Sequence, residues 1–380
     1  MKNKKLIIAL GGDRTGNYET IAPIVNEITT NFNCDVFTIT QSNLIRDQIL
    51  SSLVLSEVFC KNGCISVRKD NLDVFRNLSY LFSLINKLIK YDSIYLITNR
   101  KDYSLKFSIL YRILSIFSVK RFYTKSYSRS SLTHKRQLRK TPLSKKALQN
   151  YALIPTVGHT KEYSLIGYKQ NQLIITGYPK FYPSWKSYLT NIINKNNHKY
   201  SDVLFIFTKD YSSLKNVIFE VLKTVVMYDS LSRIILKPHP TMPIEDITEI
   251  VNDLSLPKDK HIVISTENVA FLSFKTKVVI SHATSAAYDA KIFDKHLINY
   301  YPHSKEFVDR YRNHDMDDMD NHEIMSSANS CDFISDDICY GVKDLKSALD
   351  RVSLITFENN NTLINKDTSS ELKSLHKAFS

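Results

Sequence analysis

Residues 203–240, which read VLFIFTKDYSSLKNVIFEVLKTVVMYDSLSRIILKPHP, decide the fold class of this chain. Two short apolar runs, 203–208 and 232–237, flank a segment in which apolar residues recur at helical spacing. Parallel strands need a long crossover connection, and that crossover is usually a helix. The alternation continues with further apolar runs at 261–265, 277–281 and 296–300. The pattern predicts a doubly wound α/β unit with a parallel sheet.

The first half of the chain opens in the same way. An apolar strand predicted over 5–10 ends in the loop GGDRTG, residues 11–16. A segment with apolar residues at helical spacing follows, and the next strand is predicted over 34–39. This half of the chain therefore predicts a second α/β unit of the same kind.

The domain organisation follows from length and from one polar stretch. With 380 residues the chain is too long for one ordinary hydrophobic core and long enough for two. A polar run at 194–201 separates the two alternations. We therefore expect two Rossmann-like domains facing a cleft, the first over 1–195 and the second over 196–355. The remaining residues, 356–380, are polar and predict a loosely held tail.

The composition is that of a soluble globular protein, with 43% hydrophobic and 23% charged residues. Charges interrupt the longer apolar stretches, so no secretory signal or transmembrane helix is predicted and the cytoplasm is the expected location. The five cysteines are scattered and odd in number, which predicts neither a disulfide framework nor a zinc site.

Positive charge is concentrated in the first half. Residues 1–195 contain 30 Lys and Arg against 11 Asp and Glu, whereas the remainder contains 21 against 27. The segment 120–146 holds ten basic and no acidic residues, and we expect a mobile basic loop there. Such a surface attracts an anionic partner: an acidic glycan or glycolipid acceptor, the acidic inner face of a membrane, or nucleic acid. No nucleic-acid-binding motif accompanies the loop, so nucleic acid is the less favoured partner.

The most informative site signal is Lys237-Pro238-His239-Pro240, which directly follows an apolar strand. In open α/β sheets, ligands bind beyond the carboxyl ends of the strands. The two prolines restrict the backbone around the imidazole, and Lys237 and His239 can both face a phosphate. An imidazole there can donate a hydrogen bond or a proton to a leaving phosphate oxygen. The structural alternative is a turn after an edge strand that happens to contain a histidine.

A second signal is the loop SHATSAA, residues 281–287, which follows one predicted strand and opens a helix predicted over 285–292. Ser281, Thr284 and Ser285 offer hydroxyl groups, and a helix N-terminus offers unpaired N–H groups to an anion. The structural alternative is that Thr284 or Ser285 only caps the helix. We expect the two loops to leave neighbouring strands of one sheet, which favours a shared phosphate ligand.

The motifs KPHP (237–240) and SHATSAAYDA (281–290) resemble, in order and separation, those of bacterial surface-polysaccharide transferases of the GT-B fold. That group includes sialyltransferases and polysialyltransferases, capsular Kdo transferases and CDP-glycerol glycerophosphotransferases. The segment 167–179 is also similar to their interdomain region, and the resemblance is confined to about residues 152–300. It implies a GT-B fold and a nucleotide-sugar-dependent glycosyltransferase of capsule, lipopolysaccharide or other surface-glycan synthesis.

The resemblance also implies roles for individual residues. His239 would contact the donor phosphate and act as general acid, and Thr284 and Ser285 would bind the same phosphate. A CMP-activated acidic sugar such as sialic acid or Kdo is the first-choice donor, transferred by direct displacement with inversion. The rival in this class is a CDP-glycerol- or ribitol-type transferase that moves a polyol phosphate. The rivals from other classes are a nucleic-acid-binding protein and a glycan-binding protein without turnover.

The general base is the point at which the sequence departs from these families. They place an acidic base in the first domain, often in an Asp/Glu-Asp/Glu-Gly motif, and this chain has no such motif. Asp13, beyond the first strand, is the nearest candidate, and Glu19 is the alternative. The structural alternative for Asp13 is to cap the helix that follows. On the acceptor side we also expect Arg14, with Arg129 and Arg136 from the basic loop.

Two further residues complete the predicted donor site. Lys209 and Pro240 follow predicted strands and can approach the donor. We expect no metal and no cofactor besides the nucleotide-sugar substrate, because the acidic run DMDDMD (315–320) reads as a solvated loop. A hard cation needs several converging oxygen ligands, which adjacent carboxylates in a loop do not supply.

Overall fold

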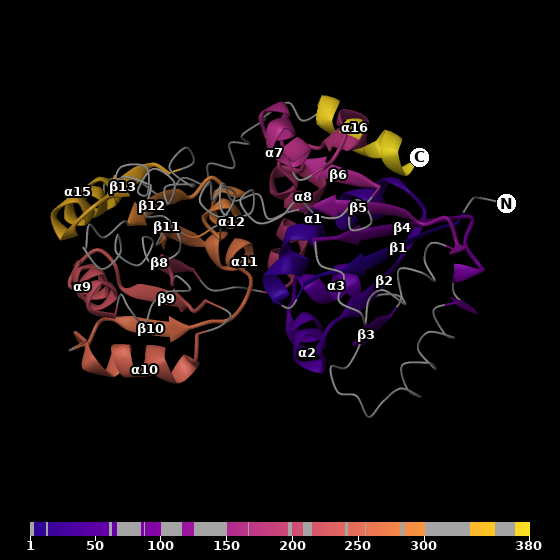
Figure 1. The fold of residues 1–380 in the computed structure, drawn as a ribbon. Helices are drawn as coiled ribbons and strands as arrows, with labels where there is room; N and C mark the ends of the chain where they lie inside the picture. The colour runs from indigo at the N-terminus through magenta and orange to yellow at the C-terminus, as the bar shows by residue number, and fades with distance from the viewer. Residues whose placement is uncertain are drawn as a thin grey trace. The chain divides into compact units, whose positions relative to one another are not determined.

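The computed structural model describes most of the chain, which forms two compact units (Figure 1). Unit 1 contains the described residues of Met1–Tyr127, Lys140–Tyr188 and Asn365–Ser380, and unit 2 contains those of Leu189–Ile364. The described residues are 4–12, 14–60, 63–66, 85–86, 88–99, 116–124, 150–165, 167–196, 200–207, 215–239, 242–254, 256–281, 284, 286–300, 335–353 and 369–380.

Among the described residues, unit 1 contains a seven-stranded parallel sheet with the order β3-β2-β1-β4-β5-β6-β7. β1 and β4 are buried along almost their whole length, as parallel strands covered on both faces must be. The chain order reverses between β1 and β4, so their carboxyl ends form the topological switch point of this sheet. The strands are β1 (Lys5–Leu10), β2 (Cys34–Thr40), β3 (Cys64–Ser66), β4 (Ser93–Thr98), β5 (Lys120–Thr124), β6 (Tyr151–Ile154) and β7 (Leu173–Ile175).

Helix α1 is fixed to the sheet of unit 1 by one aromatic side chain. Tyr18 is fully buried, its hydroxyl donates to the Ile39 carbonyl oxygen at 2.7 Å, and its ring meets Phe59 edge-on at 5.6 Å. The chain passes from unit 1 to unit 2 within α8 (Pro183–Lys195). The other described helices of unit 1 are α1 (Thr15–Asn31), α2 (Asn43–Ser51), α3 (Leu55–Phe59), α7 (Thr160–Leu165) and α16 (Ser369–Phe379), with 3-10 turns at Val157–His159, Gln170–Gln172 and Pro179–Phe181.

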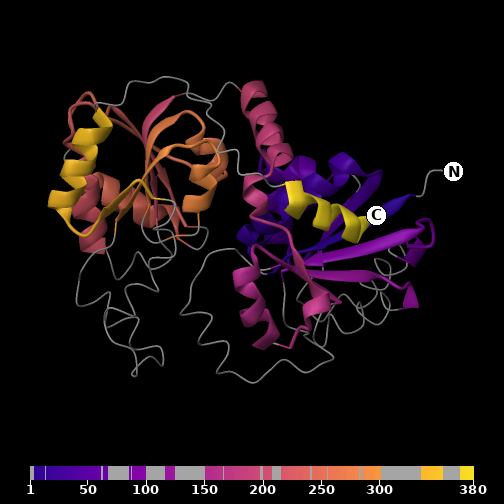
Figure 2. The same ribbon diagram turned by 90° about the horizontal axis from the view of Figure 1, so that it is seen from above.

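The C-terminal helix corrects the prediction of a loosely held tail for residues 369–380, while the rest of that segment, 356–368, lies outside the described residues. Figure 2 shows α16 (yellow) packed on unit 1, where the His376 Nε2 atom lies 2.7 Å from Glu27 Oε1 of α1. Phe379 is fully buried, and its ring stacks on Phe122 with 4.4 Å between the centroids. The last residues of the chain therefore belong to the core of the unit that contains its first strand.

Strand β5 corrects the first part of the predicted basic loop. Lys120 and Arg121 open the strand at its less buried end, whereas Phe122 and Tyr123 are buried in the sheet. Burial of two aromatic side chains outweighs the charge of the residues before them. The remainder of the predicted loop, 125–146, lies outside the described residues.

The described part of unit 2 contains a six-stranded parallel sheet with the order β10-β9-β8-β11-β12-β13. The order reverses between β8 and β11, which places the switch point of this sheet at their carboxyl ends. The strand–helix alternation predicted over 203–300 is therefore observed. The strands are β8 (Ser201–Ile206), β9 (Arg233–Lys237), β10 (His261–Ile264), β11 (Thr276–Ser281), β12 (His296–Tyr300) and β13 (Asp337–Cys339).

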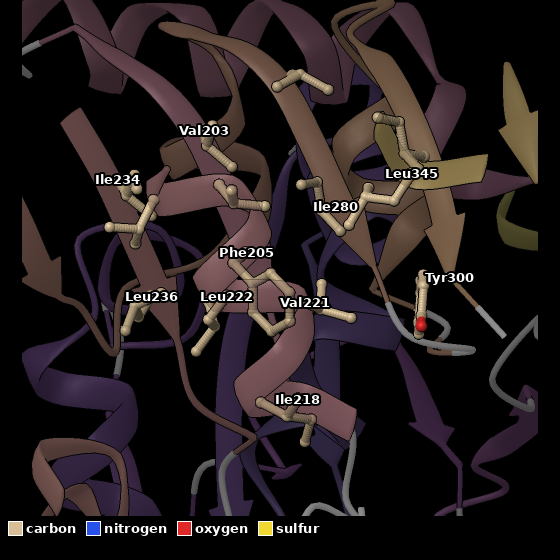
Figure 3. Packing of buried hydrophobic residues seen from close by; sticks show 14 of the residues in the cluster. Val203, Phe205, Ile218, Val221, Leu222, Ile234, Leu236, Ile280, Tyr300 and Leu345 are labelled. Carbon is tan, nitrogen blue, oxygen red and sulfur yellow. The ribbon is translucent and has the colours of Figure 1, made fainter. Parts of the chain in front are cut away.

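Helices cover both faces of this second sheet. Figure 3 shows side chains of α9 and α15 meeting those of β8, β9 and β11 in a continuous apolar core. Figure 1 shows α11 and α12 on the opposite face. The helices are α9 (Lys215–Val226), α10 (Ile244–Asp253), α11 (Val269–Ser273), α12 (Ala287–Lys291) and α15 (Val342–Ser353).

Candidate functional site

The predicted donor loops leave the unit 2 sheet at its carboxyl edge, one after β9 and the other after β11. Ile206 of β8 pairs with Lys237 of β9 on one side and with Ser281 of β11 on the other, so the last residues of three strands form one row. The expectation that the two loops leave neighbouring strands is wrong. The strands that carry them, β9 and β11, are separated by β8. His239 and Thr284 come shortly after this row and belong to the same carboxyl edge.

His239 lies in a turn that the core of unit 2 anchors. Its side chain is partly buried, and its carbonyl oxygen accepts a hydrogen bond from Met242 N at 2.8 Å. Met242 is itself buried in the core. Pro238, immediately before the histidine, fixes one backbone angle. The imidazole is therefore carried by a restrained segment beyond a buried strand, as a group that donates to a phosphate oxygen requires.

Lys237 has a different setting from the predicted one. Its side chain is buried, and its ammonium donates to the carbonyl oxygens of Thr266 at 3.0 Å and Pro238 at 3.3 Å. Because Thr266 follows β10, the lysine joins the loops after β9 and β10. Its buried positive charge lies at the carboxyl end of β9, where it can attract an anion without contacting it directly.

Ser281 and Thr284, at and after the end of β11, both form hydrogen bonds within the protein. Ser281 is fully buried, and its hydroxyl donates to Asn299 Oδ1 at 2.7 Å, which joins β11 to β12. Thr284 Oγ1 accepts a hydrogen bond from Ala286 N at 3.4 Å. Helix α12 begins at Ala287, later than the predicted start at residue 285. Thr284 therefore makes a local turn contact, whereas the N-cap residue of α12 is Ala286 and the helix has no side-chain capping bond.

Two polar residues of this edge were missing from the predicted site. Asn299 is fully buried within β12, and Asp289 of α12 is 6% exposed. The sequence carries a signal for each: a single amide inside the apolar run HLINY (296–300), and an acid within the motif at 281–290. Buried polar groups in native proteins are hydrogen-bonded, so an isolated one in an apolar strand points to a partner on a neighbouring element.

At the carboxyl end of β1 in unit 1, two glycines lie close to side chains of α1. A Cβ atom on Gly11 would lie 2.3 Å from Tyr18 Cε2, and one on Gly12 would lie 2.1 Å from Asn17 Nδ2. The buried Tyr18 ring is held in place by its hydroxyl, so position 11 has no room for a side chain, whereas the Asn17 amide is the end of a side chain that can shift. The glycine pair therefore lets α1 pack directly against the end of β1.

The acceptor-side residues that the structure describes lie at the start of α1. Arg14 is exposed and is the N-cap residue of the helix, without a side-chain capping bond. Glu19 is partly buried in the second turn. The structure thus places both at the amino end of the helix that follows β1. Six predicted site residues lie outside the described residues: Asp13, Arg129, Arg136, Lys209, Pro240 and Ser285.

The described residues contain neither a helix that could span a membrane nor a cluster of metal ligands. Among them, no helix is long and apolar enough to cross a bilayer. That part of the chain also lacks any group of three or more His, Cys, Asp or Glu side chains placed to hold a metal ion. The acidic run 315–320 is not included, because it lies outside the described residues. Cys34 has a free thiol whose pKa burial raises to about 11, which disfavours the reactive thiolate.

Comparison with known proteins places the chain by its fold. Neither a protein-family profile nor a curated protein sequence matches it. Solved structures of UDP-GlcNAc 2-epimerases do resemble it. The Methanocaldococcus jannaschii enzyme in complex with UDP-GlcNAc and UDP has a TM-score of 0.55 and 14% identity, with 99% of each chain covered. The Neisseria meningitidis enzyme bound to UDP-GlcNAc has a TM-score of 0.55 and 13% identity, again with 99% of each chain covered.

A further UDP-N-acetylglucosamine 2-epimerase structure has a TM-score of 0.56 and 11% identity, covering 100% of this chain and 95% of its own. At these identities the likeness is one of fold. It extends over the whole chain and agrees with the two doubly wound sheets observed here. The predicted fold class, an α/β protein of GT-B type with two Rossmann-like domains, is therefore confirmed.

Proposed function

We propose that this chain is a glycosyltransferase that takes its sugar from a nucleotide-activated donor and binds the donor phosphates at the carboxyl edge of the unit 2 sheet. The observation that carries the proposal is the row formed by Lys237, Ile206 and Ser281. It brings the loops of His239 and Thr284 to the carboxyl edge of the sheet on either side of β8, next to the switch point, where doubly wound sheets bind their ligands. The likeness in fold to solved structures holding UDP or UDP-GlcNAc supports the same reading.

The proposed reaction is a single displacement at the sugar carbon. An acceptor hydroxyl attacks that carbon, a new carbon–oxygen bond forms, and the bond to the phosphate oxygen breaks with inversion. Asp13 takes the proton of the acceptor hydroxyl. His239 donates to the departing phosphate oxygen, while the buried charge of Lys237 and the Thr284 hydroxyl stabilise the negative charge that develops there. No metal cofactor takes part.

The proposal includes the identity of the nucleotide and the setting of the reaction. The motif resemblance favours a CMP-activated acidic sugar, and the likeness in fold adds a UDP-activated sugar. The acceptor is an anionic glycan or glycolipid of a bacterial surface polysaccharide. The basic first half of the chain fits such an acceptor and a position at the inner face of the membrane.

A second candidate function is epimerisation of a UDP-sugar, and one observation favours it. The neighbours reported above over 99% of both chains are UDP-GlcNAc 2-epimerases. The two functions differ in their products. An epimerase returns a nucleotide sugar of unchanged mass, whereas a transferase releases the nucleotide as an acceptor gains the mass of a sugar. A polyol-phosphate transferase would instead add a phosphate-containing group to the acceptor.

A ligand screen followed by mass spectrometry tests the proposal. A nucleotide present at 100 times its Kd stabilises the fold by about 2.7 kcal/mol. We expect UDP, CMP or CDP to raise the melting temperature of the full chain, with ATP as the control. The stabilising nucleotide is then supplied as its sugar conjugate with glycan acceptors. Absence of a shift with every pyrimidine nucleotide would rule out the proposed donor site, and an isomerised donor without transfer would favour the epimerase.

A further inference from the structure

Two cysteines of unit 1 are held close together by one residue of β2. Cys60 is the C-cap residue of α3, and Cys64 opens β3, the edge strand of the sheet (Figure 1). The residue before each cysteine is bonded to Thr38. The Phe59 carbonyl oxygen accepts from the Thr38 hydroxyl at 2.7 Å, and the Gly63 carbonyl oxygen accepts from the Thr38 backbone N–H at 3.0 Å. Both cysteines are therefore anchored to the same point of the sheet.

The turn before Cys64 brings the two thiols into contact. Gly63 has a φ of 124°, in the region that favours glycine, and Cys64 then pairs with Thr38 in the parallel ladder. The Cys64 thiol donates a hydrogen bond to the Cys60 sulfur. A disulfide bond joins its sulfur atoms at about 2 Å, so two thiols already in hydrogen-bonding contact need only a small movement to form one.

The hydrogen bond between the thiols makes their acidities unequal. It lowers the pKa of the Cys60 thiol because it stabilises the thiolate, and this outweighs the opposing effect of burial. The same hydrogen bond raises the pKa of Cys64, as burial also does. Arg46 and Asp47 of the neighbouring helix α2 act on Cys64 in opposite directions. At the same pH, Cys60 is therefore the thiolate of the pair and Cys64 the thiol.

The other described cysteines lack this arrangement. Burial raises the pKa of Cys34 to about 11 and that of Cys339 to about 12. Cys60 and Cys64 are each only partly buried, so a small molecule in solution can reach them. A partly exposed thiol with a lowered pKa is the setting in which cysteines react, because the thiolate is the nucleophile.

We propose that Cys60 and Cys64 form a dithiol that exchanges reversibly with a low-molecular-weight disulfide. The Cys60 thiolate attacks one sulfur of that disulfide, whose S–S bond breaks, and the released thiolate takes a proton from solvent. Cys64 then loses its proton to solvent, attacks the Cys60 sulfur and displaces the second small thiolate, which is protonated in turn. The two cysteines are oxidised by two electrons to a disulfide, and the small disulfide is reduced to two thiols.

Mass spectrometry of the full chain after treatment with oxidised glutathione tests this proposal. We expect the wild-type chain to lose two hydrogen atoms, with peptide mapping placing the new bond between Cys60 and Cys64, and dithiothreitol to restore both thiols. With limiting iodoacetamide, Cys60 should be alkylated about tenfold faster than Cys34, because its larger thiolate fraction is only partly offset by lower intrinsic nucleophilicity.

Two variants separate the roles of the cysteines. Cys64→Ser keeps the attacking thiol but cannot close the disulfide, so it should retain one glutathione on Cys60. Cys60→Ser should take up glutathione about tenfold more slowly than Cys64→Ser, because the remaining thiol has the raised pKa. Cys34→Ser is the matched control and should be oxidised as wild type is.

The proposal is overturned if the reduced wild-type chain forms no bond between Cys60 and Cys64 in oxidised glutathione. It is also overturned if Cys64→Ser retains no glutathione on Cys60, or if Cys60→Ser takes up glutathione as fast as Cys64→Ser does. The first of these results is obtained on the unaltered chain, so it stands whether or not each variant folds.

Discussion

The carboxyl edges of the two sheets differ in how their polar groups are satisfied. In unit 2 the chain satisfies its own groups: Lys237 donates to two carbonyl oxygens, and Ser281 donates to Asn299. In unit 1 the residues that follow β4 and β2 are the amides Asn99 and Gln41. Lys237 and Ser281 at the unit 2 edge are hydrogen-bonded within the protein, whereas two amide atoms in unit 1 lack a hydrogen-bond partner.

The difference matches two kinds of ligand. A phosphate brings its own charge and needs a preorganised electropositive edge, which a lysine held by carbonyl oxygens can provide. A neutral sugar brings hydroxyls and needs donors and acceptors that the protein has not already used. This difference fits the proposal that the donor phosphates bind at the unit 2 edge and the acceptor in unit 1.

The largest expected effect comes from the imidazole of unit 2. His239→Ala should lower the rate of sugar transfer about 10²- to 10⁴-fold, the usual contribution of a general acid. The melting temperature should change little, because the side chain is only partly buried. The matched control is His261→Ala, an exposed histidine at the opposite end of the same sheet, at the start of β10. Full activity of the His239 variant would contradict the proposed donor site in unit 2.

The next effect separates the stability of the two units. Phe379→Ala removes a fully buried ring that stacks on Phe122, and such truncations cost about 3–5 kcal/mol. We expect the calorimetric transition of unit 1 to fall while that of unit 2 stays, with proteolysis identifying the unit that opens. Lys373→Ala, an exposed position on the same helix, is the control and should change neither. An equal shift of both transitions would mean that α16 does not belong to unit 1 alone.

A smaller effect tests the glycine pair. Gly11→Ala should destabilise unit 1 by about 1–3 kcal/mol, the usual cost of overpacking. The new methyl group would meet the Tyr18 ring, which cannot move away because its hydroxyl is bound to Ile39. Gly16→Ala is the control, since its nearest neighbour, Glu19 Oε2, would be 3.7 Å away. Thermal melting of both variants checks the prediction, and equal stability of the two would refute the packing role of Gly11.

The smallest effect is a pH dependence in unit 2. Burial favours a raised pKa for Asp337, but hydrogen bonds from His296 and Arg351 outweigh it, and the net pKa is lowered. A lowered pKa in the folded state stabilises the fold above the ordinary carboxyl pKa of about 4, and this contribution is lost as the pH falls through the folded value. Asp337→Asn should cost about 1 kcal/mol at pH 7 and nothing near pH 2.

Urea denaturation of the full chain between pH 2 and pH 7, followed through the unfolding of unit 2, checks this prediction. Asp229→Asn is the control, because Asp229 is exposed and should show no such convergence with wild type. A difference between wild type and Asp337→Asn that persists unchanged at pH 2 would contradict the assigned cause.

The sequence is most informative where local patterns decide the structure. The apolar runs of β8, β9, β11 and β12 are short, separated by helical segments and buried, so their periodicity was sufficient to predict the sheet of unit 2. The position of His239 beyond β9 follows from the same pattern. The order of the strands does not, because β8 enters between β9 and β11 only in the folded sheet.

The failures have identifiable physical causes. The sequence did not predict α16 because its apolar residues are few, and the helix is stabilised by the burial of Leu375 and Phe379 against unit 1. The setting of Lys237 was missed because its partner Thr266 lies 29 residues away, beyond another strand. The orphaned amides of Asn99 and Gln41 cannot be read from sequence, since they are defined by what the fold leaves unpaired.

Hydrogen–deuterium exchange of the full chain, with and without UDP or CMP, locates the donor site. If the donor phosphates bind at the unit 2 switch point, the nucleotide should slow exchange in peptides covering 233–242 and 276–290. Peptides covering 5–17 and 93–99 of unit 1 should respond to the acceptor sugar instead. Slowed exchange confined to unit 1 on nucleotide binding, with 233–242 and 276–290 unchanged, would contradict the account.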